Sequence, residues 1–181
     1  YTKLKLKIEV DMSNGLPQQM INYGQGGKLD ASMLYALQLL VKAGHLEQVA
    51  WSKDFMISPC FPKQKVGRTF PESDLPLVRV LNDLRLVNQR LIQHKDEFQE
   101  NNPTRNRATS SVPHGATWFG DIDMHDAFHY GVLHEDSRQF LVIYWKGVCY
   151  KWVGIPQGLA CASGYWMALM VHLLNTALGN A

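Results

Sequence analysis

Two runs rich in β-branched and aromatic residues, FLVIYW and VCYKWV, stand on either side of Lys146-Gly147. Two such runs across a two-residue turn that contains glycine predict a β-hairpin over residues 140–153. A hairpin requires antiparallel pairing, which limits the folds open to the chain. The elements around it alternate too irregularly for a doubly wound parallel sheet, so we expect an α+β fold with helices packed on an antiparallel sheet.

The first twelve residues alternate apolar and charged side chains, and this period of two predicts a half-buried strand. Its apolar members are Leu4, Leu6, Ile8 and Val10.

Residues 30–44 predict a helix, because Leu34, Leu37 and Val41 fall at helical spacing. Asp30 is the expected N-cap, and Gly44 is expected to end the helix.

The remaining segments predict further elements. We expect a strand near 55–62, a strand that leads into a helix over 78–91, and a long exposed connection over 93–115. An apolar strand that ends in acids is expected over 117–124, and an apolar helix over 165–178.

Composition narrows the class of protein. Hydrophobic residues make up 46% of the 181 residues and charged residues 19%, which is apolar enough to fold, and a net charge of +2 argues against a polybasic binder. No apolar run approaches the ~20 residues of a membrane helix. Cys60, Cys149 and Cys161 are odd in number and lie far apart, so neither a disulfide framework nor a zinc site is expected, and a reduced intracellular compartment is favoured.

The segment GDIDMHDAF offers a candidate cation site. Asp121 and Asp123 share one face of a strand by period two, Asp126 follows in the turn, and carboxylates at a strand end suit Mg²⁺. Taken alone, the segment is equally a strand end with solvated acids. His125 and His129 lie four residues apart, but no glutamate stands between them in a metal-binding pattern.

Basic residues concentrate in residues 60–92, where six Lys or Arg stand against three acids. A phosphate-binding lobe requires such a surplus, although each cation alone fits a solvated surface. The six are Lys63, Lys65, Arg68, Arg79, Arg85 and Arg90. Further on, Pro156 and Gly158 in IPQG predict a turn that feeds a helix.

In this order and spacing, the segments resemble the N-terminal half of a retroelement reverse transcriptase of the retroviral and LTR-retrotransposon kind. The resemblance covers about 130 residues, roughly 30–160, and rests on SPCFPKQK, VRVLNDLRLVN and above all TWFGDIDMHDAFHYGVLHEDSRQFLVIYWKGVCYKWVGIPQG. The hairpin WKGVCYKW is also similar to that of tyrosine-recombinase retrotransposons, so the element class stays open.

The resemblance implies a right-hand polymerase fold with fingers and a partial palm. It divides the chain into fingers (1–98 and 131–161), palm with the first catalytic motif (99–130) and a palm helix (162–181). It also implies template-directed DNA synthesis by two-metal nucleotidyl transfer, with Mg²⁺, or Mn²⁺ in its place, as cofactor.

Site residues follow from the resemblance position by position. Asp123 matches the catalytic aspartate that binds both metal ions, with the Met124 carbonyl as a further ligand. The implied nucleotide contacts are the Asp126 and Ala127 amides, Phe128 at the sugar, Lys65 and Arg79 at the phosphates, and Gln157 and Gly158 beside the nucleotide and template. Asp83, Arg85 and Asn88 belong to a second fingers motif that supports the template or the fold. Lys63 is the rival of Lys65, and Asp121 is either an extra acid near the metals or an exposed strand residue.

The sequence also departs from the family. The second acidic motif, aromatic-x-Asp-Asp, is missing, since no Asp or Glu occurs between Ser137 and Ala181, and the thumb and RNase H segments are absent too. The chain starts at Tyr1 and reads as a fragment of a longer polyprotein, inactive alone. The alternative is a catalytically inactive polymerase-like scaffold that binds nucleic acid or protein, and a metal phosphohydrolase lacks the ligands it needs.

The expected partners are an RNA or DNA template with its primer, a deoxynucleoside triphosphate and the rest of the polyprotein, with no membrane contact. The expected location is intracellular: the cytoplasm, a virus-like particle or the nucleus.

Overall fold

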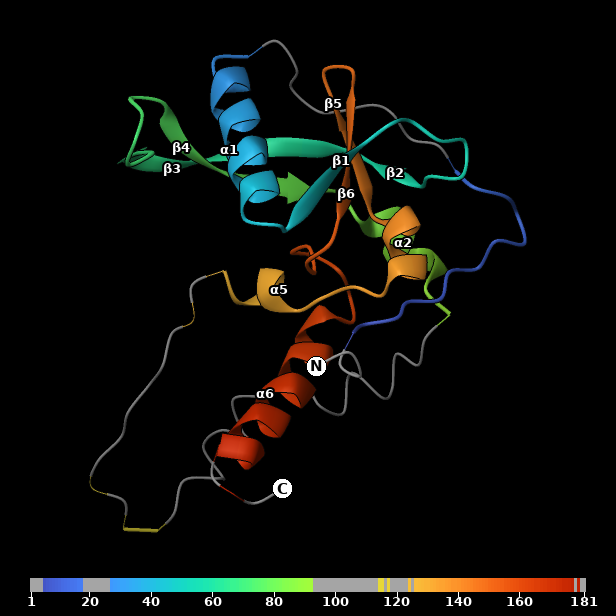
Figure 1. Ribbon diagram of the computed structural model, residues 1–181, viewed down its shortest axis with the longest axis vertical. Helices are drawn as coiled ribbons and strands as arrows, with labels where there is room; N and C mark the ends of the chain where they lie inside the picture. Colours follow the sequence, from blue (N-terminus) through green and yellow to red (C-terminus); the bar gives the residue numbers. More distant parts are fainter. Residues whose placement is uncertain are drawn as a thin grey trace.

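In the computed structural model of the chain, the described residues are 5–17, 27–92, 114–115, 117, 124, 126–177 and 179. Within them, a four-stranded sheet and a two-stranded ribbon combine with helices into a mixed fold of the expected α+β class (Figure 1). The elements in chain order are α1 (Asp30–Lys42), β1 (Leu46–Val49), β2 (Ile57–Ser58), β3 (Cys60–Thr69), β4 (Pro76–Asn82), α2 (Arg85–Arg90), α5 (Ala127–Tyr130), the 3-10 helix η2 (Glu135–Phe140), β5 (Val142–Trp145), β6 (Val148–Trp152) and α6 (Ala162–Ala177).

The four-stranded sheet has the strand order β1-β6-β5-β2. β5 and β6 form the predicted hairpin, and β1 pairs antiparallel with β6 while β2 pairs parallel with β5. The sheet is therefore mixed and not wholly antiparallel as expected, because β2 joins its edge in the parallel direction. The turn residues Lys146 and Gly147 have φ of 44° and 89°. Positive φ at both central residues is what a two-residue type I′ turn requires, and it explains why glycine stands at the second position.

The main core lies on one face of this sheet. Trp145 and Trp152, at the ends of β5 and β6, are each 1% exposed and pack with Met33 and Leu37 of α1. Leu6 from the N-terminal segment belongs to the same cluster. Burial of two indole rings and several aliphatic side chains is the largest favourable contribution to the folding of this part of the chain.

Residues 5–17, here called the N-terminal strap, confirm the predicted alternation without forming a regular strand. Leu6, Ile8 and Val10 are buried while the charged residues at positions 7 and 9 are exposed. Isolated bridges join Leu6 to Leu133 and Val10 to Leu91. The strap therefore changes partner along its length, which ends regular strand pairing while the side chains keep a period of two.

Helix α1 ends as the sequence predicts. Gly44 follows with φ of 77°, and the amides of Ala43 and Gly44 donate to the carbonyls of Leu39 and Val41. This is the left-handed stop that glycine favours. Of the three residues at helical spacing, Leu37 is fully buried, Val41 is half-buried and Leu34 is 41% exposed.

The N-cap prediction for Asp30 is wrong. Leu29 is the N-cap residue and makes no side-chain capping bond, and Asp30 is the first helical residue. The Asp30 carboxylate instead lies 2.6 Å from Lys146 Nζ in the β5–β6 turn. An acid in the first turn is favoured by the helix dipole, and here it also meets a distant cation that the sequence pattern did not reveal.

The antiparallel strands β3 and β4 form a ribbon that extends beside the four-stranded sheet, with α1 lying across it (Figure 1). Val78 of β4 and Phe70 pack against Ala36 of α1, and Tyr35 meets the Phe70 ring edge-on at 4.9 Å. The second small cluster therefore ties one face of the ribbon to α1. The strand-then-helix prediction for 78–91 is confirmed by β4 and α2, and that for 55–62 by β2 and the start of β3.

Helix α6 extends away from the sheet (Figure 1). It confirms the predicted apolar helix, although Val171 and Leu174 are each about half exposed. No helix among the described residues is long and apolar enough to cross a membrane. The expected strand 117–124 and connection 93–115 fall almost wholly outside the described residues.

Candidate functional site

The β3–β4 ribbon places two cations on its outer face. Lys63 of β3 lies directly opposite Arg79 of β4 in the antiparallel register, and both are exposed. Val78 and Val80, the neighbours of Arg79, pack toward α1. Because successive side chains of a strand point to opposite faces, Arg79 and Lys63 lie on the face away from α1. Opposed residues have Cβ atoms about 4.5–5.5 Å apart, so this pair makes a concentrated positive site.

Lys65 lies two residues beyond Lys63 and is half-buried. The regular pairing stops after Gln64 and resumes only at Thr69, so Lys65 sits in the irregular part of the ribbon. The register therefore pairs Arg79 with Lys63, the rival that the sequence offered. Arg79 is directly across the ribbon from Lys63, whereas Lys65 is two residues nearer the tip.

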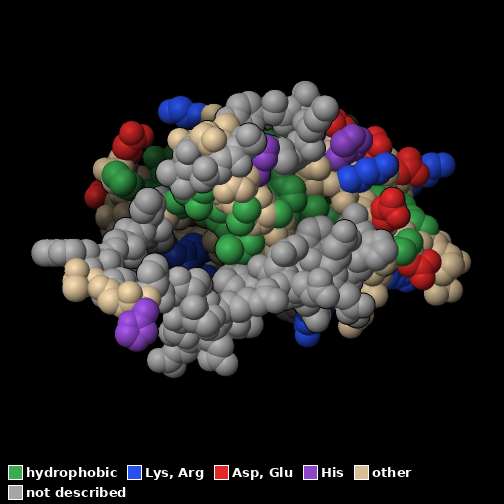
Figure 2. All heavy atoms as spheres, turned by 90° about the horizontal axis from the view of Figure 1, so that it is seen from below, with side chains coloured by type: hydrophobic (Ala, Val, Ile, Leu, Met, Phe, Trp, Pro, Cys, Tyr) green, Lys and Arg blue, Asp and Glu red, His purple; other side chains and the backbone are tan. Residues whose placement is uncertain are grey.

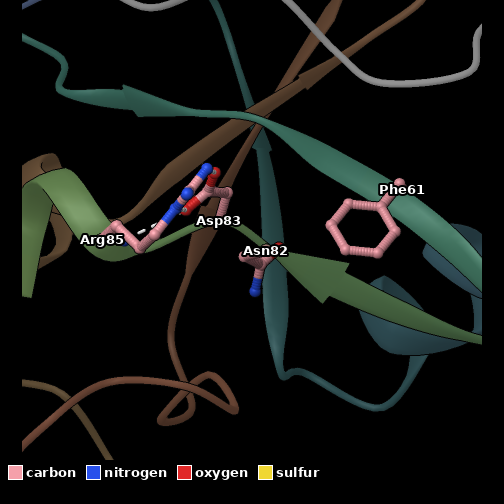
Figure 3. A pocket seen from close by; sticks show the side chains of 4 residues that line it. All are labelled: Phe61, Asn82, Asp83 and Arg85. Atoms are coloured by element: carbon pink, nitrogen blue, oxygen red, sulfur yellow. Dashed lines mark hydrogen bonds and ion pairs between the residues drawn. The ribbon is translucent and has the colours of Figure 1, made fainter.

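A hollow of about 400 Å³ opens beside the base of the ribbon. Its lining is Phe61 of β3 with Asn82, Asp83 and Arg85 from the junction of β4 and α2 (Figure 3). Seen from below in the sense of Figure 1, the molecule gathers hydrophobic side chains at the centre of the face, with Lys and Arg side chains recessed beside them (Figure 2). Aromatic, amide and ionic groups are thus available within one concave region.

Asp83 and Arg85 form a forked ion pair in this hollow. Arg85 donates from Nε to Asp83 Oδ1 at 2.8 Å and from Nη2 to Oδ2 at 2.5 Å. The Asp83 side chain is 13% exposed and that of Arg85 is 79% exposed. The Asp83 amide also donates to the Pro59 carbonyl at 2.8 Å, which fixes the end of β4 against β3. The pair shapes the hollow and leaves one edge of the guanidinium toward solvent.

Asn88 of α2 joins this region to the Pro156-Gln157-Gly158 turn. Its Nδ2 donates to the Gly158 carbonyl at 2.9 Å, and its Oδ1 accepts from the Ala160 amide at 2.9 Å. Gly158 has φ of 94°, and a Cβ added there would meet the Asn82 carbonyl at 4.0 Å. The turn therefore lies against the end of β4, with Gln157 half-buried and Gly158 exposed.

Helix α5 is connected to the same turn through a short antiparallel ladder. Val132 bridges Gly154, and the Ile155 amide donates to the Gly131 carbonyl at 2.9 Å. A Cβ on Gly154 would lie 2.3 Å from the His129 carbonyl, so only glycine permits this close approach. The ladder ends one residue before Pro156, which brings α5 and the turn to the same end of the molecule.

The residues at the start of α5 differ in backbone conformation and in packing. Asp126 is exposed and lies in the left-handed region with φ of 50°, and Ala127 is the first helical residue. Phe128 is half-buried, packs against the main core and meets Trp166 of α6 edge-on at 6.3 Å. The Phe128 ring therefore has a packing role in the described structure.

The residues predicted to bind metal lie largely outside the described residues. Asp121, Asp123 and His125 belong to that part of the chain, while Met124 is described and 41% exposed. Among the described residues, no group of three His, Cys, Asp or Glu side chains lies close enough to hold a metal ion. The His129 ring lies 5.3 Å from that of Trp152 and 5.4 Å from that of His45, an arrangement of packed rings.

The cysteines are poor nucleophiles. Burial raises the pKa of the Cys60 thiol to about 12 and that of Cys161 to about 11, and it raises the pKa of Cys149 as well. A thiol protonated at neutral pH does not attack carbonyl or phosphoryl groups. Covalent thiol chemistry is therefore not what this fold offers.

Sequence reasoning missed one residue of this region, Phe61, and one contact, that of Asn88 with Gly158. Phe61 lines the hollow, and its signal was its position in β3 two residues before Lys63, because strand alternation puts both on one face. The contact of Asn88 with Gly158 spans 70 positions and has no local signal. The structure brings together Asp83, Arg85, Asn88, Gln157 and Gly158, with Lys63 and Arg79 on the adjoining ribbon.

Comparison with known proteins identifies the fold. No protein-family model and no curated protein sequence matches the chain. Three solved structures of the foamy viral protease-reverse transcriptase do match: the complex with an RNA/DNA hybrid (TM-score 0.57, 21% identity, 89% of this chain and 20% of that one), the complex with dsDNA (0.59, 21%, 88% and 28%) and the dRH form with dsDNA (0.61, 19%, 89% and 25%).

These matches support a reverse transcriptase-like, polymerase-like fold. The chain spans between 20% and 28% of the length of the three viral chains.

Proposed function

We propose that this chain is the fingers and partial palm of an RNA-directed DNA polymerase. The observation that carries the proposal is a pair of hydrogen bonds at Asn88, whose Nδ2 donates to the Gly158 carbonyl and whose Oδ1 accepts from the Ala160 amide. They join two segments that the sequence singled out independently, the 78–91 segment and the 155–158 turn. The fold of nucleic-acid-bound reverse transcriptases supports the same assignment.

In this proposal the ribbon and the turn hold opposite ends of an incoming nucleotide. Lys63 and Arg79 neutralise the triphosphate, with Arg79 as a planar fork and Lys63 as a point charge, and Lys65 is the second candidate for the lysine. Gln157 and Gly158 lie beside the nucleotide and template, and Phe128 faces the sugar. The Asp126 and Ala127 amides are the remaining phosphate donors. Positioning and charge neutralisation are the main demands of phosphoryl transfer.

The metal part of the proposal rests mainly on Asp123, which lies outside the described residues. Asp123 and the Met124 carbonyl would hold Mg²⁺, which would stabilise the attacking and leaving oxygens. The described residues offer no three-ligand cluster of their own, so no step is derived through the ion. On its own, the 181-residue chain is expected to bind primer–template and not extend it, because it lacks the second acidic motif.

The experiment is primer extension by the longer protein that contains this chain, with Asp123→Asn beside Asp54→Asn. Asp54 is exposed in the loop between β1 and β2, so its substitution controls for the loss of one carboxylate. Asp123→Asn should abolish incorporation and leave primer–template affinity nearly unchanged, because the metal charge acts in the transition state. Retention of more than about a tenth of the rate, ~1.4 kcal/mol, would remove the metal assignment. Binding without incorporation by the wild type would instead favour the scaffold alternative.

A further inference from the structure

The Asn88 side chain uses both ends of its amide on one turn. Nδ2 donates to the Gly158 carbonyl and Oδ1 accepts from the Ala160 amide, each at 2.9 Å. These two peptide groups flank Leu159, so a single planar side chain fixes the backbone on both sides of that residue. Among side chains of this length, only asparagine combines a donor and an acceptor in this way.

The Asn88 hydrogen bonds matter for the turn because its other contacts come mainly from apolar side chains that pack into the core. Ile155, Pro156 and Leu159 are buried, which sets the depth of the turn. Gly158 and Ala160 are exposed, and Gly158 is the residue with positive φ. A glycine at an exposed tip loses the most backbone freedom on ordering, so its placement depends on the bonds made to its peptide groups.

Asn88 is itself held by the segment that carries the ribbon. Its backbone amide donates to the Leu84 carbonyl at 2.8 Å. The residue before Leu84 is Asp83, whose backbone amide donates to the Pro59 carbonyl beside β3. The nearby charged groups are Asp83 and Arg85, which pair with each other, and Arg90, whose Nη1 donates to the Gly15 carbonyl at 2.5 Å. The ribbon is therefore connected to the turn by backbone hydrogen bonds and by the uncharged side-chain amide of Asn88.

We propose that Asn88 is a positioning residue that sets the Gln157-Gly158 turn at a fixed place relative to the ribbon cations. It contacts neither nucleotide nor template, and it determines how strictly the site distinguishes a correctly paired nucleotide from a mispaired one. This inference rests on the proposed function, because the turn and the ribbon are the two sides between which the nucleotide is held.

The first test measures the turn itself in the 181-residue chain. Asn88→Asp keeps the size and the acceptor of the side chain but replaces the donor with a carboxylate that faces the Gly158 carbonyl. Gln89→Glu makes the same chemical change at the next, exposed position of α2 and serves as the control. The carboxylate repels the Gly158 carbonyl, so the whole turn, with the Ala160 amide, should move away from position 88. Hydrogen-exchange protection of the Ala160 amide should therefore fall about tenfold at pH 7 in Asn88→Asp and stay unchanged in Gln89→Glu.

The pH dependence separates a positioning hydrogen bond from general damage to the fold. A protonated carboxyl can donate again, so Asn88→Asp should regain Ala160 protection as the pH falls through about 4. Wild type and Gln89→Glu should show no such recovery in protection factors corrected for intrinsic exchange. Unchanged protection at pH 7, or no recovery at low pH with the fold intact, would overturn the positioning role of Asn88.

The second test measures discrimination in the longer protein with its full site. In Asn88→Asp, the ratio of kcat/KM for the paired nucleotide to that for a mispaired one should fall about tenfold, while Gln89→Glu keeps the wild-type ratio. An equal loss for both nucleotides would overturn the positioning role. If wild type incorporates nothing, the proposed function and the role in discrimination both fail, and the exchange data still decide whether Asn88 places the turn.

Discussion

The four-stranded sheet and the β3–β4 ribbon are held in different ways. The sheet covers a core that contains Trp145 and Trp152, each 1% exposed. The ribbon has two strands, is covered by α1 on one face and carries Lys63 and Arg79 on the other. Near its tip, Val66 is 92% exposed. A two-stranded hairpin alone is at best marginally stable in water, so the ribbon depends on α1.

The difference shows where stability resides and where the proposed binding surface lies. Large apolar side chains fill the core beneath the sheet and leave little charge on its buried face. The ribbon buries fewer side chains, and two cations lie side by side on its exposed face. Like charges directly opposite on paired strands are destabilising, which a well-packed neighbour must offset. Substitutions in the sheet core should therefore lower stability, whereas substitutions of the ribbon cations should lower the proposed binding and leave stability nearly unchanged.

The largest expected effect is on the sheet. Trp145→Ala should lower the free energy of unfolding by about 3–5 kcal/mol, because it leaves a cavity in the main core. Urea denaturation followed by circular dichroism measures this, with Trp51→Ala as the control, since Trp51 is 54% exposed. A loss below about 2 kcal/mol for Trp145→Ala would contradict the assignment of stability to the sheet core.

Phe70→Ala should act on the ribbon more than on the sheet. Phe70 is 5% exposed and packs in the small cluster with Tyr35, so the loss should be near the low end of the range for Phe→Ala, about 3 kcal/mol. Hydrogen exchange resolves the location: amides of β3 and β4 should lose protection more than those of β5 and β6. Equal loss in all four strands would show that ribbon and sheet unfold as one unit.

Removing the paired cations should weaken binding and spare the fold. Lys63→Gln with Arg79→Gln should lower primer–template–nucleotide affinity about tenfold, ~1.4 kcal/mol, and reduce its salt dependence, because fewer counterions are released. Stability should rise by a few tenths of a kcal/mol as the repulsion is relieved. Lys42→Gln with Lys53→Gln, two exposed lysines elsewhere, matches the change in charge. Equal loss of affinity in both pairs would leave only a net-charge effect.

The smallest expected effect concerns the ion pair between the N-terminal strap and η2. A hydrogen bond from Lys5 Nζ at 2.5 Å is the main cause that lowers the pKa of Glu135 to about 2. Because the folded pKa is depressed, the stabilisation is present above about pH 4.5 and is lost as the pH falls toward 2. Urea midpoints over this range should therefore fall more for wild type than for Glu135→Gln. Parallel curves would show that the contact adds no measurable stability.

Local patterns predicted the elements well where one segment sets its own structure. The hairpin of β5 and β6 follows from alternation and from Lys146-Gly147, and α1 stops at Gly44 because glycine accepts positive φ. The burial of Leu6 and Val10 also follows from period two. The Asp30 cap failed because Lys146, far along the chain, offered that carboxylate another partner.

The sequence named most residues of the candidate site, but it did not predict how they lie relative to one another. Arg79, Asn88 and Gly158 were named from the sequence, yet their relations depend on tertiary structure. The pairing of Arg79 with Lys63 is set by the irregularity after Gln64, which no spacing rule supplies. The bonds of Asn88 to the turn require α2 and the turn to be packed first. The role of Asp123 stays a prediction.

The strand order of the sheet has a consequence for the order of folding during synthesis. β1 pairs with β6, and β2 pairs with β5, so the first half of the chain finds its sheet partners only in the second half. Contacts so distant in sequence close large loops and slow folding. Until Trp152 has left the ribosome, β1 and β2 have exposed edges. A chain cut after residue 92 should therefore remain unfolded, which circular dichroism would show. A translation pause or truncation in the middle of the chain therefore exposes aggregation-prone strands.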